Sequence, residues 1–324
     1  MQHTYAQDGE EHRPPKVSII GAGMVGGSLA YTLVLERLAG EIVLVDINED
    51  LAAGQAMDIN HALSFVGPTV VRSGGYGECS GSDVVVITAG AAQKPGETRL
   101  DLAQRNFDIY KGIVPKLADV AADAVILVVS NPVDVLTYAA IKLSGLPWQR
   151  VVGSGTVLDT ARFRYELSAH CRLDPRNVHA YVLGEHGDSE VAAWSATNVA
   201  GVAFPGFCQK CGGGCPSGEL REIFERVKSA AYEIIRLKGA TYYAIALGTT
   251  RMIEAVLRDQ NTVVTASTLL HGEYGIEDVC MSVPVVLGRS GARMAIEMPI
   301  SDEEKDALKR SAGVLRDVLG GIGL

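Results

Sequence analysis

The stretch that decides the fold is KVSIIGAGMVGGSLAYTLVLERLAGEIVLVD, residues 16–46. A short apolar run, Val17–Ile20, ends at three glycines in G-x-G-x-x-G spacing, and a helical pattern begins among them. Gly21 suits a tight turn, Gly23 leaves room for a pyrophosphate, and Gly26 lets a helix lie close on the strand. The stretch therefore predicts a strand, a turn and a helix that together bind a dinucleotide.

The same stretch predicts which dinucleotide binds. A helix that opens with Met24 and Val25 points free N–H groups and the positive end of its dipole at phosphate. A second apolar run, Ile42–Val45, ends in Asp46, twenty positions after Gly26. A carboxylate there accepts hydrogen bonds from a ribose diol and repels a 2′-phosphate. We therefore expect NAD rather than NADP.

The composition is that of a globular protein. The chain has 324 residues, of which 47% are hydrophobic and 21% charged, enough for two domains. A formal net charge of −9 argues against nucleic acid or an anionic membrane surface as the main partner. Residues 1–15 lack the apolar core of a signal peptide, so we expect a disordered N-terminal lead. Six cysteines, with Cys79, Cys171 and Cys280 scattered, suit a reduced cytoplasm.

Apolar strands and helical segments alternate in the first half of the chain. We expect strands at 69–72, 83–88 and 124–129, and helices at 49–66, 98–121 and 132–143. This alternation predicts an α/β fold, a doubly wound parallel Rossmann sheet. Ligands bind at the carboxyl ends of such strands, where Gly90, Ser130 and Asn131 lie.

The second half has a different pattern. We expect helices at 159–169, 219–237, 242–258 and 302–319, and short strands at 178–183, 191–198, 263–269, 279–287 and 292–297. These elements predict a mixed α+β domain for substrate binding and catalysis over residues 153–324. The NAD-binding Rossmann domain then covers residues 16–152.

Three polar segments carry the chemistry: AGAAQKPGETR at 89–99, GSGTVLDTARFR at 153–164 and GEHGDSE at 184–190. The first follows a strand and predicts a mobile lid. With the glycine motif, these segments closely resemble the L-2-hydroxyacid dehydrogenases, and within that family the lactate dehydrogenases, from about Lys16 to the C-terminus. The resemblance implies reversible hydride transfer between NADH and pyruvate, giving L-lactate, in a homotetramer.

His186 is the expected acid/base. Hydride transfer from an alcohol leaves a proton, which histidine is suited to accept near neutral pH. The resemblance matches His186 to this role, and Asp159 would orient its ring. Asp159 and Arg162 lie three positions apart, on one helix face, so Arg162 can clamp the substrate carboxylate. An ordinary helical ion pair between them is the alternative.

The other pocket residues come from the resemblance. Arg99 would polarise the ketone oxygen, and Asn131 and Thr241 match positions that contact substrate or nicotinamide. Where malate dehydrogenases carry an arginine for the second carboxylate of oxaloacetate, this chain has Gln93, which suits the methyl end of pyruvate. A related L-2-hydroxyacid or malate dehydrogenase is one alternative. A non-catalytic NAD-binding regulator is another, although it would be expected to lose its acid/base pair.

Two basic residues predict an effector site. Arg164 lies two positions after Arg162, about 200° around the helix, so it faces away from the active site. The resemblance matches Arg164 and His179 to the pair with which many bacterial lactate dehydrogenases hold fructose 1,6-bisphosphate between subunits. Two ordinary surface residues are the alternative.

The segment FCQKCGGGCPS at 207–217 departs from the family. Cys208, Cys211 and Cys215 have a spacing close to that of a zinc knuckle, but four ligands are usual and no fourth is evident nearby. We therefore expect no metal, and reduced thiols on a glycine-rich surface loop. A partial metal site or a redox-sensitive disulfide is the alternative.

Overall fold

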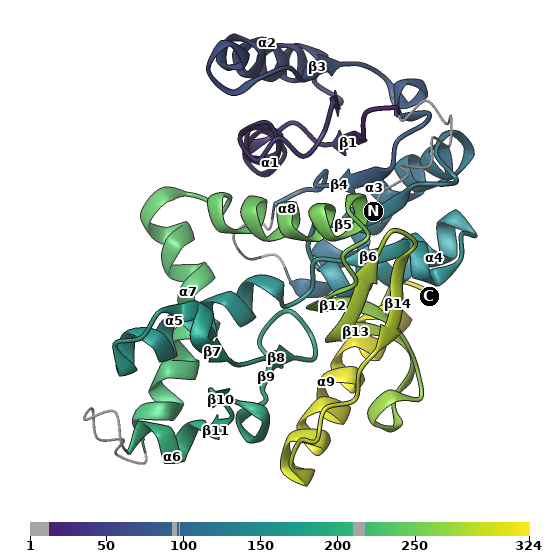
Figure 1. The fold of residues 1–324 in the computed structure, drawn as a ribbon. Helices are drawn as coiled ribbons and strands as arrows, with labels where there is room; N and C mark the ends of the chain where they lie inside the picture. The colour runs from purple at the N-terminus through teal and green to yellow at the C-terminus, as the bar shows by residue number, and fades with distance from the viewer. Residues whose placement is uncertain (1–12, 93–95, 97, 210–217) are drawn as a thin grey trace, which may run out of the picture.

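A nine-stranded sheet runs through both halves of the chain, in the order β14-β13-β12-β6-β5-β4-β1-β2-β3 (Figure 1). The structure is a computed structural model that describes residues 13–92, 96, 98–209 and 218–324. The parallel strands are β1 (Lys16–Ile20), β2 (Glu41–Val45), β3 (Val70–Ser73), β4 (Val84–Ile87), β5 (Val125–Val128) and β6 (Val151–Gly153). The antiparallel strands are β12 (Thr262–His271), β13 (Glu277–Gly288) and β14 (Gly291–Ala295).

Helices pack on this sheet in two groups: α1 with α2 and α8, and α3 with α4. The helices are α1 (Met24–Leu35), α2 (Glu49–Val66), α3 (Arg99–Val120), α4 (Val133–Ser144), α5 (Val157–Cys171), α6 (Phe204–Cys208), α7 (Glu219–Lys238), α8 (Tyr243–Leu257) and α9 (Asp302–Gly321). Local sequence explains where some of them start. Thr98 and Asp101 form a capping box at α3, and Ser301 and Glu304 form one at α9.

β1 lies at the centre of the parallel part because it pairs with β2 on one side and β4 on the other. All five of its residues are buried, as the apolar run predicts for a strand covered on both faces. The strand order reverses between β1 and β4, and ligands of doubly wound sheets bind at such a switch point. The predicted α/β class and Rossmann sheet are confirmed.

The strands of the second half differ from their prediction in two ways. β12, β13 and β14 extend the Rossmann sheet, where we expected strands of a separate domain. β12 joins through one residue pair, Ser267 with Gly153 of β6, a three-residue strand that was not predicted. The predicted strands at 178–183 and 191–198 are each interrupted, giving β7 (Val178–His179), β8 (Val182–Leu183), β9 (Val191–Ala192), β10 (Asn198–Val199) and, beyond them, β11 (Val202–Ala203).

The residues that the structure describes form two buried apolar clusters. The larger follows the nine-stranded sheet from β1 to α9 and includes Ile19, Val86 and Leu315. The smaller lies between α5, α6 and α7 and includes Phe163 and Phe204. The second cluster fixes α5, the helix that carries Asp159 and Arg162.

The predicted N-terminal lead lies mostly outside the described residues, which begin at Arg13. Arg13 forms an ion pair with Asp83 at 2.8 Å. Within the part of the chain that the structure describes, every helix is too short or too polar to cross a membrane.

Candidate active site

The glycine-rich turn has the geometry that its sequence predicts. Gly21 has φ +104°, and a Cβ there would lie 2.7 Å from the backbone nitrogen of Ala89. A Cβ on Gly26 would lie 1.8 Å from the carbonyl oxygen of Gly21, so α1 can approach the turn only with glycine there. Gly23, in contrast, has no described atom within 4 Å of its Cβ position. The turn thus offers open space where a pyrophosphate needs it.

Asp46 faces this turn from the end of β2. Its Oδ2 accepts a hydrogen bond from the N–H of Ala22 at 2.6 Å, and its Oδ1 accepts one from Asn48 at 2.9 Å. Each carboxylate oxygen keeps a second lone pair for a ribose diol. α1 starts at Met24, and none of the described side chains caps it, so its first N–H groups are available to an anion. These features fit a dinucleotide.

Two adjoining pockets lie at the carboxyl ends of the parallel strands, and Asn131, Arg162 and His186 line both. The first has a volume of about 300 Å³, and the second about 250 Å³. The first also contains Val25, Gly90, Ser130 and Thr241. The second contains Arg99 and Asp159. The two pockets therefore bring together nine of the predicted catalytic, substrate and cofactor residues.

Other predicted residues lie elsewhere. The side chain of Met24 is exposed and lines a separate hollow, so only its backbone lies at the turn. Gln93 lies outside the described residues, as do 94, 95 and 97 of the predicted lid. Arg99, which we expected on that lid, is the first residue of α3.

His186 and Asp159 form a close pair. The Nδ1 of His186 lies 2.5 Å from Oδ2 of Asp159, and Nη1 of Arg162 donates to the other oxygen, Oδ1, at 2.9 Å. Asp159 is only 2% exposed, whereas the His186 side chain keeps 24% of its surface accessible. Its Nε2 is therefore the ring nitrogen left for a substrate.

Burial alone would lower the pKa of His186. The charge of Asp159 and the hydrogen bond to it outweigh this effect, with help from Asp134 and Glu190, and raise the pKa to about 9. Burial alone would raise the pKa of Asp159, but His186 and Arg162 hold it below its ordinary value. At neutral pH the pair is therefore an imidazolium and a carboxylate, ready to donate a proton.

Two buried carboxyl groups beside this pair were not predicted. Oδ2 of Asp134, in the first turn of α4, accepts a hydrogen bond from the backbone N–H of His186 at 2.7 Å. Burial raises the pKa of Asp134 to about 6. Burial and the nearby charge of Asp159 raise the pKa of Glu190, which lines the second pocket, to about 8. Glu190 ends the segment GEHGDSE that the sequence singled out, but its spacing gave the residue no role, and Asp134 has no local sequence pattern that separates it from ordinary acidic residues.

Arg99 contacts the buried carboxylate of Glu185, the residue before His186. A Cβ on Gly187 would lie 2.6 Å from Nη2 of Arg99, so glycine at that position leaves room for the guanidinium. The residues before and after His186 therefore both contact or adjoin the Arg99 guanidinium, which lines the second pocket.

Asn106 of α3 joins the ends of β4 and β5. Its Nδ2 donates to the carbonyl oxygen of Asn131 at 2.6 Å, and its Oδ1 accepts from the N–H of Ala91 at 2.7 Å. Ser130 Oγ donates to the carbonyl oxygen of Ala89 at 2.6 Å. These bonds hold Ser130 and Asn131 at the pocket wall, a role for Asn106 that the sequence did not indicate.

Arg164 faces away from both pockets, as its position on the helix predicts. Its Nε donates to the carbonyl oxygen of Ala180 at 3.0 Å, and its guanidinium lies 5.3 Å from the ring centre of Tyr181. His179 ends β7, directly before Ala180, and is exposed. Arg164 therefore bonds to the residue that follows His179 in the chain.

Cys208 differs from its prediction. It ends α6, is fully buried and is disulfide-bonded, so the expectation of a reduced thiol on a surface loop is wrong for this residue. Apolar residues of the smaller core cluster surround the end of α6, which explains the burial. Cys211 and Cys215 lie outside the described residues.

Comparison with known proteins shows the family of this chain. Residues 15–153 match the family described as lactate/malate dehydrogenase, NAD binding domain, and residues 156–321 match its alpha/beta C-terminal domain. The chain therefore belongs to the lactate/malate dehydrogenase family. It is an NAD-dependent oxidoreductase, and NAD is its cofactor.

Within the family, the similarity is to L-lactate dehydrogenases, as predicted. The L-lactate dehydrogenase of Thermoanaerobacter pseudethanolicus is 55% identical over 304 residues, covering 94% of this chain and 98% of that protein. L-lactate dehydrogenase 1 of Clostridium acetobutylicum is 53% identical over 307 residues, covering 95% and 98%. The crystal structure of a minor L-lactate dehydrogenase from Enterococcus mundtii has a TM-score of 0.92 at 43% identity, covering 96% of this chain and 99% of that chain.

Proposed function

We propose that the protein interconverts pyruvate and L-lactate. The observation that carries this proposal is the group formed by His186, Asp159 and Arg162, in a pocket that continues toward the glycine-rich turn. When bound, NADH supplies the hydride that reduces the ketone carbon. The residues proposed to hold the cofactor are Gly21, Gly23, Met24, Val25, Gly26, Asp46, Gly90, Ser130 and Asn131.

Each side chain then has one task in the reaction. His186 donates its Nε2 proton to the ketone oxygen, and Asp159 stabilises the imidazolium beforehand. Arg162 gives one N–H to Asp159 and keeps others for the pyruvate carboxylate. Arg99 places positive charge near the ketone oxygen, and Asn131 and Thr241 complete the wall. In lactate oxidation the same groups act in reverse.

We expect the substitution Gln93→Arg to shift preference from pyruvate to oxaloacetate. Arginine would supply a charge partner for a second carboxylate and would leave that charge unpaired with pyruvate. The measurement is kcat/KM for both acids, with NADH oxidation followed in wild type and variant. A ratio unchanged by the substitution would remove Gln93 from the specificity proposal. A wild type that prefers oxaloacetate would instead make the protein a malate dehydrogenase.

We also propose that Arg164 and His179 bind fructose 1,6-bisphosphate across a subunit interface of a homotetramer. Burial lowers the pKa of Arg164, and none of the described acidic residues forms an ion pair with it, so a phosphate would supply a counter-charge. In a symmetric assembly the anion bridges both copies and turns their mutual repulsion into attraction.

The sugar bisphosphate should therefore lower KM for pyruvate and favour the tetramer in wild type, but not in Arg164→Gln. Steady-state kinetics and sedimentation velocity, each with and without the sugar bisphosphate, measure the two effects. Equal responses in wild type and variant, or none in wild type, would contradict the effector site.

We place the boundary between the NAD-binding and catalytic domains at residues 152 and 153, and the enzyme in the cytoplasm. The boundary falls within β6, one residue before the end of the first segment that matches the family, and the second segment starts at residue 156. We infer that the enzyme acts in glycolysis or fermentation, where it would oxidise NADH to NAD.

A further inference from the structure

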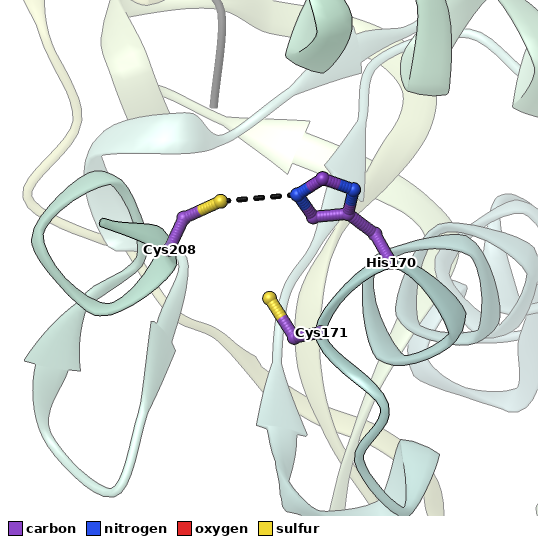
Figure 2. A group of neighbouring side chains, drawn as sticks. All are labelled: His170, Cys171 and Cys208. Atoms are coloured by element: carbon purple, nitrogen blue, oxygen red, sulfur yellow. Dashed lines mark hydrogen bonds between the residues drawn. The ribbon is translucent and has the colours of Figure 1, made fainter. Parts of the chain in front are cut away.

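Three potential metal ligands meet at the end of α5, away from the pocket. His170 and Cys171 are the last two residues of α5, and Cys208 is the last residue of α6 (Figure 2). The Nε2 of His170 lies 3.1 Å from Sγ of Cys208, and one ligand atom from each of the three residues lies within 4.8 Å of the others. Figure 2 shows both sulfur atoms and the imidazole directed toward one shared space.

These distances suit zinc. In a tetrahedral site, Zn–S bonds of about 2.3 Å and Zn–N bonds of about 2.0 Å place neighbouring ligand atoms about 3.5–3.8 Å apart. The three side chains would need to shift only slightly to reach that spacing. Histidine and cysteine are also the ligands most often found in structural zinc sites.

Glu219 provides a second, independent indication. Its Oε1 lies 3.2 Å from Nδ1 of His170, the ring nitrogen that does not face Cys208. Metal-binding histidines commonly donate their second N–H to a carboxylate, which fixes the ring and makes the ligand nitrogen more basic. Glu219 opens α7, so this contact links a third helix to the cluster.

The surroundings also suit a bound cation. Cys208 is fully buried, Cys171 is 6% exposed, and the His170 side chain is 9% exposed. Phe204 and Leu167 of the smaller core cluster lie on the same helices as the ligands. Thiolates in such an apolar setting need a counter-charge nearby, and a divalent cation would provide it.

We propose that His170, Cys171 and Cys208 bind zinc when Cys208 is reduced, with Glu219 orienting the histidine. Cys208 is disulfide-bonded in the structure, so the disulfide and the zinc site are alternative states. An added dithiol reduces the disulfide of Cys208. The protein disulfide takes up two electrons and two protons to give two thiols, and the added dithiol is oxidised to its own disulfide. Zinc then displaces the protons of Cys208 and Cys171 to solvent.

The described residues supply three ligands, and zinc takes four. A water molecule is a common fourth ligand of a zinc ion that is held by three side chains, so the described cluster can bind the ion with one open position.

The test uses the full chain, reduced with a dithiol that is then removed without air, and mixed with ZnCl2. We expect about one zinc per chain by elemental analysis after gel filtration, and much less in protein kept oxidised. At free zinc about 100 times the Kd, the Tm of the reduced protein should rise by about 5 °C. Co²⁺ in place of zinc should show thiolate-to-cobalt charge-transfer absorption.

Matched variants locate the ion. Cys171→Ser, Cys208→Ser and His170→Gln should each lose the zinc and the cobalt signal, whereas Cys79→Ala, which removes another buried thiol, should keep both. Glu219→Gln should weaken zinc binding by about 10- to 100-fold without abolishing it.

A reduced wild type that binds no zinc and keeps its Tm would overturn the proposal, whatever the variants do. So would zinc retained in full by both Cys171→Ser and Cys208→Ser. That result would move the ion to another group, such as Asp159, His186 and Glu190. Neither outcome depends on dehydrogenase activity, so the test is separate from that of the proposed function.

Discussion

His186→Asn is expected to lower kcat for pyruvate reduction by at least about two orders of magnitude, the usual contribution of a general acid. Asparagine can still reach Asp159, but it has no group in place of Nε2 to deliver a proton. Stopped-flow or steady-state kinetics measure the loss, and NADH fluorescence should show that cofactor binding is retained. His61→Asn, a change of an exposed histidine on α2, is the matched control.

The pH dependence of the wild type gives a second measure of the same pair. Because the folded protein holds the pKa of His186 at about 9, the donor is protonated at neutral pH, and kcat/KM for pyruvate should fall as pH rises through about 9. Asp159→Asn removes the main cause of the upward shift, so the fall should move to lower pH. Near-normal turnover in His186→Asn, or an unmoved profile in Asp159→Asn, would contradict the assignment.

Arg162→Gln is expected to lower kcat/KM for pyruvate by about two to three orders of magnitude, mainly through KM. Loss of a largely buried, charge-assisted partner costs about 2–5 kcal/mol, and the Arg162 side chain is only 14% exposed. The kcat/KM of Arg162→Lys should lie between those of the wild type and Arg162→Gln, because lysine keeps the charge but not the planar fork.

Two controls separate a substrate contact from a general disturbance of α5. NADH binding should be unchanged in Arg162→Gln, and the exposed Arg176→Gln, just beyond α5, should behave as wild type. If Arg162→Gln lowered kcat alone and left KM unchanged, the residue would act on Asp159 rather than on the substrate carboxylate.

Much of the cofactor-binding half could be predicted because its signals are local. The apolar run predicts β1, the glycine spacing predicts the turn, and the position of Asp46 after an apolar run predicts the end of β2. Each of these signals lies in the segment that forms the element. α2 occupies the predicted residues, and α3 starts at the Thr98 cap. Asp159 and His186 were found through motifs, and the structure places them in contact.

The remainder depends on contacts between distant segments. β6 has only three residues, too few to show the alternation of apolar and polar residues that marks a strand. Its place in the sheet depends on β5 and β12. Asp134 becomes part of the site because α4 carries it beneath His186. Likewise, no spacing rule connects Cys208 to His170, since they meet only after α5 and α6 pack together.

The short strand β6 also limits how far the two halves can behave as modules. It is parallel to β5 on one side and pairs with β12 on the other, so one set of backbone hydrogen bonds crosses the boundary between the family's two domains. Either half made alone would expose an unpaired, apolar strand edge, which favours pairing between molecules. An exchange of one half between relatives would therefore have to preserve the register at Gly153 and Ser267, or the hybrid would aggregate before it folded.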